Sequence, residues 1–199
     1  MEVFDIFSTK VLIDRNVKLD INRQEMMEDI DNIIVEGDAV RAPLYQSHPI
    51  LFQNWKNHWS LNWENLMHSF KRQVENYLAL SREMYGRPEQ YEISYMTSWF
   101  YRKDMENLND SHSNNPIHNH FPAQVVGIYY LDNPGFDGTT LYNPNTSMHQ
   151  SSITKSYSLG TGDWIIFPGW MQHCTSSSAI QSRLNRTVIA CNSYLKVVE

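Results

Sequence analysis

Alternation of apolar and polar residues runs through the second half of the chain and predicts a series of short strands. The clearest alternation is YEISYMTSWFYR at 91–102, and AQVVGIYYLDNP at 123–134 is a second predicted strand, closed by Asn-Pro. Further short apolar stretches follow, each ended by glycine, proline or asparagine: GTTLYNP, KSYSLG, GDWIIFPG and RTVIACNSYL. Close spacing of many short strands favours a β-sandwich or barrel.

The first half of the chain has helical rather than alternating periodicity. A strand-like opening, VFDIFSTKVLI, precedes a predicted helix in NRQEMMEDIDNIIVE. The strongest helical pattern runs from about residue 62 to 84, with Asn62 as the predicted N-cap and GRP at 86–88 as the stop. Its apolar stripe comprises Trp63, Leu66, Phe70, Val74, Tyr77 and Leu78. Residues 41–60 are expected to form a loop.

These two halves predict one domain over residues 1–199. Residues 1–89 would form a helical support region with the first strand, and residues 90–199 a strand-rich core. A chain of 199 residues is long enough to bury a sizeable core. We expect the helices to pack on one face of the β-structure.

Composition narrows the choice of partners and compartment. The net charge of −6 argues against a general nucleic-acid binder, which needs a basic face. The N-terminus lacks the features of a signal peptide, and the apolar runs are too short to span a bilayer, so no membrane partner is expected. Two cysteines form no disulfide framework. We therefore expect a cytoplasmic protein.

Three histidines are candidates for a metal site. His118 and His120 are two residues apart, so in an extended segment both side chains lie on one side. Two imidazoles this close can bind one metal ion. His173 follows the predicted strand GDWIIFPG and is placed to reach a site at the mouth of a barrel. The pair alone also fits two loop histidines that bind nothing.

A cationic residue opens the last predicted strand. Alternation in RTVIACNSYL places Arg186, Val188, Ala190 and Asn192 on one face. If that face is interior, the guanidinium needs an anionic partner, and a ligand carboxylate would accept two parallel hydrogen bonds from it. We include Asn192 with Arg186 among the candidates for ligand binding. Arg183 is the second choice for the arginine.

The order and spacing of these pieces resemble the iron(II)- and 2-oxoglutarate-dependent oxygenases, most closely a prolyl-hydroxylase-like branch common in bacteria and tailed bacteriophages. The resembling segments are HNH at 118–120, VVGIYYLDNP at 125–134, GTTLYNPN at 138–145, GDWIIFPGWMQH at 162–173 and RTVIACN at 186–192. They cover most of the chain from about residue 90, and the opening IFSTKVL also looks similar. The resemblance implies a mainly β, double-stranded β-helix (jelly-roll) fold with the N-terminal helices packed on one sheet.

The resemblance also implies roles for single residues. His118 and His173 match the two metal histidines, and Arg186 matches the basic residue that binds the far carboxylate of 2-oxoglutarate. Tyr130 matches a tyrosine that donates a hydrogen bond to the same carboxylate. The implied cofactors are Fe(II) and the cosubstrate 2-oxoglutarate, with ascorbate as a candidate reductant. The implied activity is that of a dioxygenase, a hydroxylase coupling substrate C–H oxidation to decarboxylation of 2-oxoglutarate to succinate.

One position departs from the wider superfamily, because His120 stands where an aspartate or glutamate is usual. Three arrangements remain open. His120 is the third ligand, which its spacing favours; a carboxylate from Asp110, Asp132 or Asp137 replaces it; or two histidines hold the metal alone. A second departure is RTV where many relatives have Arg-x-Ser, which removes one hydroxyl from the cosubstrate site.

Two other functions remain open at this stage. One is a non-catalytic, cupin-like module that binds a metal or ligand, and the other is a 2-oxoglutarate-independent dioxygenase with three-histidine iron. A buried Arg186 facing the metal would favour the oxygenase. We expect a small-molecule or peptidyl substrate together with O₂. The sequence leaves the oligomeric state open, a homodimer included. The polar stretch at 104–116 is expected to form a lid.

Overall fold

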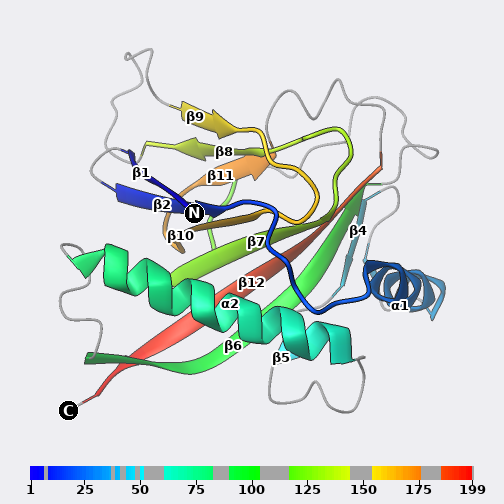
Figure 1. Ribbon diagram of the computed structural model, residues 1–199, viewed down its shortest axis with the longest axis horizontal. Helices are drawn as coiled ribbons and strands as arrows, with labels where there is room; N and C mark the ends of the chain where they lie inside the picture. Colours follow the sequence, from blue (N-terminus) through cyan, green and yellow to red (C-terminus); the bar gives the residue numbers. More distant parts are fainter. Residues whose placement is uncertain are drawn as a thin grey trace.

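Figure 1 shows a computed structural model in which two helices and a large sheet support a smaller sheet. It describes residues 1–6, 9–36, 39–40, 44–47, 50–51, 61–82, 90–103, 117–143, 154–175 and 185–198. The elements are β1 (Glu2–Ile6), β2 (Thr9–Asp14), α1 (Arg23–Glu36), β3 (Ala39–Val40), β4 (Leu44–Ser47), β5 (Ile50–Leu51), α2 (Leu61–Leu80), β6 (Tyr91–Lys103), β7 (Val125–Asp132), β8 (Thr139–Tyr142), β9 (Thr154–Tyr157), β10 (Trp164–Pro168), β11 (His173–Thr175) and β12 (Arg186–Val197).

The strands form two antiparallel sheets. The large sheet has the order β1-β2-β10-β7-β12-β6-β4-β3, with β5 also pairing to β6, and the small sheet has the order β11-β8-β9. An isolated bridge between His118 and His173 adds the segment around His118 to the free edge of β11. Consecutive strands therefore alternate between the two sheets along much of the second half. This arrangement confirms the predicted jelly roll.

Strand β7 separates the two hydrophobic cores because its side chains alternate between its faces. Val125, Tyr129 and Leu131 belong to the core beneath the helices. Val126, Ile128 and Tyr130 belong to the core between the two sheets. All of these side chains are buried, which explains why the strand reads as a continuous apolar run rather than a strict alternation.

Helix α2 covers the outer face of the large sheet, as predicted from its apolar stripe (Figure 1). Phe70 stacks on Trp164 of β10 with ring centroids 5.7 Å apart. The helix begins at Leu61, so the predicted N-cap, Asn62, lies inside it. The Asn62 side chain instead joins the two helices, because its Oδ1 accepts from the backbone N–H of Asn22 and its Nδ2 donates to Glu25, both at 2.7 Å.

Two expectations for the N-terminal half need correction. The strand-like opening forms two strands, β1 and β2, which pair antiparallel rather than continuing as one. The region 41–60, expected as a loop, contributes β4 and β5, which pair with β6. β4 and β5 are short and lack the long apolar alternation that marks a central strand, so the sequence pattern did not reveal them. Within the described ranges, no helix has the length and apolar character that a bilayer crossing needs.

Gly127 of β7 is required by the closeness of α2. A Cβ atom at this position would lie 2.6 Å from Cε2 of Phe70 and 2.9 Å from Cδ1 of Ile166. We predict that Gly127→Ala lowers the free energy of unfolding by about 1–3 kcal/mol, because the extra methyl overpacks a fully buried contact. Denaturant unfolding measures the change. The exposed helical substitution Glu75→Ala serves as a control and should stay within about 0.5 kcal/mol of wild type; an equal effect of the two would contradict the packing argument.

Candidate metal centre

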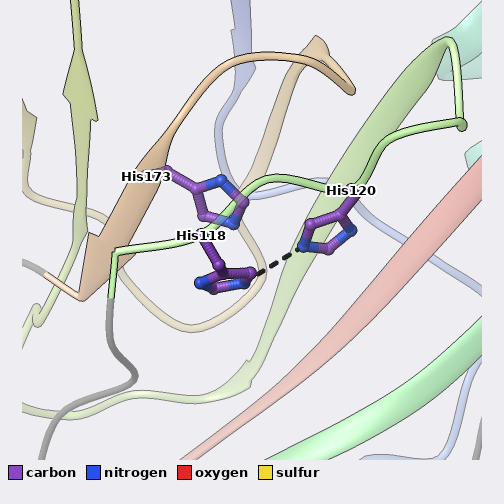
Figure 2. Close-up of side chains that lie close together, drawn as sticks. All are labelled: His118, His120 and His173. Carbon is purple, nitrogen blue, oxygen red and sulfur yellow. Dashed lines mark hydrogen bonds between the residues drawn. The ribbon is translucent and has the colours of Figure 1, made fainter.

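Three histidines meet at one end of the space between the sheets. The backbones of His118 and His173 exchange two hydrogen bonds, of 3.0 and 2.8 Å, which place the residues directly opposite one another. The backbone N–H of His120 donates to the carbonyl of Gly169 at 2.8 Å, which holds the next part of the loop against the end of β10. Figure 2 shows the three rings turned toward a common centre.

The spacing of the rings suits one metal ion. The Nε2 atoms of His118 and His120 are 3.3 Å apart, and one nitrogen from each of the three histidines lies within 4.8 Å of the others. Two ligands at right angles, each about 2.1 Å from an ion, lie about 3 Å apart. The nitrogens therefore need only small side-chain rotations to bind one ion on one of its faces.

Hydrogen bonds on the far side of two rings select the nitrogen that faces the centre. Nδ1 of His120 lies 2.7 Å from Oδ1 of Asn192, and Nδ1 of His173 lies 3.1 Å from the carbonyl oxygen of Met171. Both partners are acceptors, so each Nδ1 carries the proton and donates it. This leaves the Nε2 lone pair free to bind a metal, as is usual for metal-bound histidines.

Burial keeps these rings neutral. It lowers the pKa of His120 to about 4, and the hydrogen bond to Asn192 offsets part of that effect. Burial, with the neighbouring His118 and His120, also lowers the pKa of His173 well below its usual value. Neutral imidazole is the form that binds metal, so at neutral pH no proton has to be displaced from either ring.

Among the described residues, no carboxylate joins the histidine cluster. Asp132 and Asp137, considered from the sequence as replacements for a histidine ligand, lie elsewhere; Asp137 is buried close to Lys103 and Tyr130. Asp110 lies outside the described residues. The geometry thus brings His120, rather than Asp132 or Asp137, to the other two histidines.

A pocket runs from the histidines to Arg186 between the two sheets. The free space in and above it measures about 470 Å³, including solvent at the open mouth. Trp99 stacks on His120 at 5.2 Å and forms part of the wall, whereas Trp164 is buried beneath the helices. The narrow space suits an elongated small ligand rather than a bulky cofactor.

Hydroxyl groups surround Arg186 at the closed end of the pocket. The side chain of Arg186 is 4% exposed and its Nη2 donates to Oγ1 of Thr175 at 2.9 Å. The hydroxyls of Tyr130 and Thr139 are 2.7 Å apart, and burial raises the pKa of Tyr130 to about 12 although Arg186 opposes the rise. The phenol therefore stays protonated and can donate a hydrogen bond. Together these groups present hydrogen-bond donors to this end of the pocket.

Thr139 and Thr175 were missed from the sequence. They are directly opposite each other in the β8–β11 pair, so both face the pocket. Spacing could have revealed Thr175, because it lies two residues after His173 on the same strand face.

The other predicted candidates are divided between the two ends of the pocket. Asn192 shares the face of Arg186, as alternation predicts, but its amide contacts His120 rather than the anion site. Tyr130 lies with Arg186. The second-choice arginine, Arg183, and the expected lid at 104–116 lie outside the described residues.

No protein-family model matches the chain, and no curated protein matches its sequence. Solved structures do match. A prolyl-4-hydroxylase from Pseudomonas putida aligns over 95% of this chain and 94% of its own, with a TM-score of 0.62 and 9% identity. The epimerase SnoN from nogalamycin biosynthesis, a non-heme α-ketoglutarate-dependent enzyme, aligns over 95% and 81% in its complex with Fe³⁺, α-ketoglutarate and nogalamycin RO, with a TM-score of 0.57 and 10% identity.

This chain has the fold of the iron- and 2-oxoglutarate-dependent oxygenases. A prolyl hydroxylase from Trichoplax adhaerens, in complex with a peptide fragment of the hypoxia-inducible factor oxygen degradation domain, also aligns over 92% of this chain and 83% of its own (TM-score 0.56, 12% identity). The likeness to this oxygenase fold extends to the helices as well as the jelly roll, since it covers nearly the whole chain. At sequence identities of 9–12%, this likeness shows the fold alone. The chemistry has to be argued from the residues of the site.

Removing the Asn192 amide should weaken metal binding, because this group orients the His120 ring and fixes its proton on Nδ1. We predict that Asn192→Ala lowers the affinity for Zn²⁺, used as a redox-inert probe, by about 10- to 100-fold. Competition with a chromophoric chelator measures the affinity. Asn76→Ala is the matched control, because Asn76 is exposed on α2 away from the histidines and should leave the affinity unchanged. Equal affinities for the two variants would contradict this role of Asn192.

Proposed function

We propose that the protein is an iron(II)- and 2-oxoglutarate-dependent dioxygenase, a hydroxylase that couples oxidation of a substrate C–H bond to decarboxylation of 2-oxoglutarate to succinate. The observation that carries this proposal is a single narrow pocket with three converging histidines at one end and a buried Arg186 at the other. The histidines alone would equally suit a structural metal ion, and the arginine alone would suit a simple anion. A metal chelator joined to a distal anion is the ligand that satisfies both ends.

The three histidines fit iron(II). Imidazole is a good ligand for this ion, and three nitrogens on one face leave the remaining coordination positions to other ligands. Bound there together with the 2-oxo acid, iron would supply the activation of O₂, chemistry for which side chains have no equivalent. Three neutral histidines, Fe²⁺ and dianionic 2-oxoglutarate sum to zero charge. His118, His120 and His173 are our proposed ligands, with His120 in the position of the usual carboxylate.

Arg186 would hold the far carboxylate of 2-oxoglutarate. Its guanidinium can donate two parallel hydrogen bonds to a carboxylate, and the hydroxyls of Tyr130, Thr139 and Thr175 lie beside it. Distance supports the assignment. His173 and Thr175 are two residues apart on one face of β11, which separates them by about 7 Å along the strand. An extended five-carbon dicarboxylate is comparable in length.

Asn192 would act on the metal rather than on the cosubstrate. Its amide oxygen holds the proton of His120 on Nδ1, so it orients a ligand without touching the ion. Trp99, stacked on His120, would restrict access of water to the same side.

A second function is also testable, because three histidines without a carboxylate suit a dioxygenase that needs no 2-oxo acid. The buried Arg186 argues against it, since an isolated cation far from water is costly unless an anion joins it. The substrate itself is not specified by these residues. The proposal includes both small molecules and peptides as substrates. Ascorbate would act only as a reductant. The homodimer stays a prediction.

The first test is turnover without a substrate. With Fe(II), ascorbate, 2-oxoglutarate and air, we expect slow formation of succinate, which mass spectrometry or an enzyme-coupled assay detects. Arg186→Met should raise the concentration of 2-oxoglutarate needed for half-maximal rate by about 100-fold, because it removes a charge-assisted pair of hydrogen bonds. Arg186→Lys keeps the charge and should lose less. Consumption of O₂ by wild type without succinate would favour the alternative dioxygenase.

The second test concerns the third ligand. We expect His120→Ala to lower affinity for Fe(II), measured anaerobically by chelator competition, by about 100-fold or more, since one of three protein ligands disappears. His120→Asp should retain binding, because a carboxylate is the usual ligand of such iron sites. His68→Ala, on the exposed side of α2, is the control. Unchanged affinity in His120→Ala would mean that two histidines hold the metal alone.

A further inference from the structure

A second buried cation lies beside Arg186. Lys103 ends β6 and is directly opposite Arg186 in the β6–β12 pair, so both side chains start on the same face. That face of β6 also carries Trp99 and Tyr101, which line the pocket. Lys103 is 1% exposed and Arg186 is 4% exposed. Two like charges at such positions destabilise a sheet unless an anion accompanies them.

Asp137 is a buried carboxylate that interacts electrostatically with Lys103. It is 2% exposed, in the connection between β7 and β8. Burial lowers the pKa of Lys103 most, the charge of Asp137 raises it, and the charge of Arg186 lowers it. Asn133 fixes the Asp137 backbone, because its Nδ2 donates to the Asp137 carbonyl and to that of Leu159, both at 2.6 Å. Asp137 is thus held in place by its backbone as well as by charge.

The balance of these three groups leaves one positive charge. One carboxylate offsets one of two cations, and the remaining charge lies where Arg186 faces the pocket. Within the described part of the chain, the buried Nε of Arg186 has no hydrogen-bond partner. An unsatisfied N–H on a buried guanidinium is costly, and a ligand acceptor would remove that cost. A ligand anion in the pocket would supply both the opposite charge and the acceptor.

We propose that Lys103 and Asp137 form a buried counter-ion pair that sets the charge at the closed end of the pocket to +1, and so selects a 2-oxo acid with one distal carboxylate. This inference rests on the proposed function and adds two positioning residues to it. Lys103 pairs with the Asp137 carboxylate, which leaves the Arg186 guanidinium available to bind the ligand. Without Lys103, the Asp137 carboxylate would pair with Arg186 and compete directly with the distal carboxylate.

The test is a cycle of charge variants with binding as the readout. Protein loaded with Mn²⁺ in place of Fe²⁺ is titrated anaerobically with 2-oxoglutarate in a calorimeter. Lys103→Met should weaken binding by about tenfold or more, because it removes one charge from a poorly screened site. Lys103→Met/Asp137→Asn restores the charge of +1 and should return the affinity to within about threefold of wild type. A residue needed only for packing would not be rescued in this way.

Two controls keep the result interpretable. The affinity for 2-oxopentanoate, whose distal end is uncharged, should be equal in wild type and Lys103→Met. Asp137→Asn alone should bind 2-oxoglutarate at least as tightly as wild type, and it tests the idea even if Lys103→Met does not fold. A loss of more than about tenfold in folded Asp137→Asn, or wild-type affinity in Lys103→Met, overturns the inference. Absence of 2-oxoglutarate binding to the wild type would instead overturn the proposed function.

Discussion

The two backbone hydrogen bonds between His118 and His173 are the contact on which the site depends. They join a loop that precedes β7 to the short strand β11, and so attach the segment with the first two histidines to the small sheet. Because the residues are directly opposite in this bridge, their side chains emerge on the same side. The bond from His120 to Gly169 then turns the third ring into the same space.

The pocket that results has two chemically different ends. Burial makes the side chains neutral at one end, whereas the side chain at the other end stays charged. At the histidine end it favours the neutral form of the rings, which prepares lone pairs for a cation. At the arginine end the guanidinium keeps its charge when buried, since arginine is not deprotonated in proteins. A molecule that is a chelator at one end and an anion at the other therefore matches the pocket along its whole length.

Much of this arrangement could be predicted from single-strand periodicity. The face shared by Arg186 and Asn192, the burial of Tyr130 and the α2 stripe all follow from a repeat that is visible within one element. Contacts that depend on register between strands could not be read in this way. Thr175 facing Thr139, and Lys103 facing Arg186, require knowledge of which residues are opposite in a pair. The N-terminal hairpin and the short edge strands were missed for the same reason: their pairing partners, rather than their own residues, define them.

Strand β11 carries a metal-binding candidate and an anion-site hydroxyl on consecutive inward positions, His173 and Thr175. Inward positions on a strand recur only every second residue, since the intervening side chain points to the other face. The spacing of about 7 Å between these two side chains is therefore fixed by the strand itself. A mutation that shifted the register of β11 would move both side chains together and would not adapt the pocket to a slightly longer acid. A ligand of another length would have to be accommodated by a change in the size of the side chains that line the pocket, because the strand geometry itself does not change.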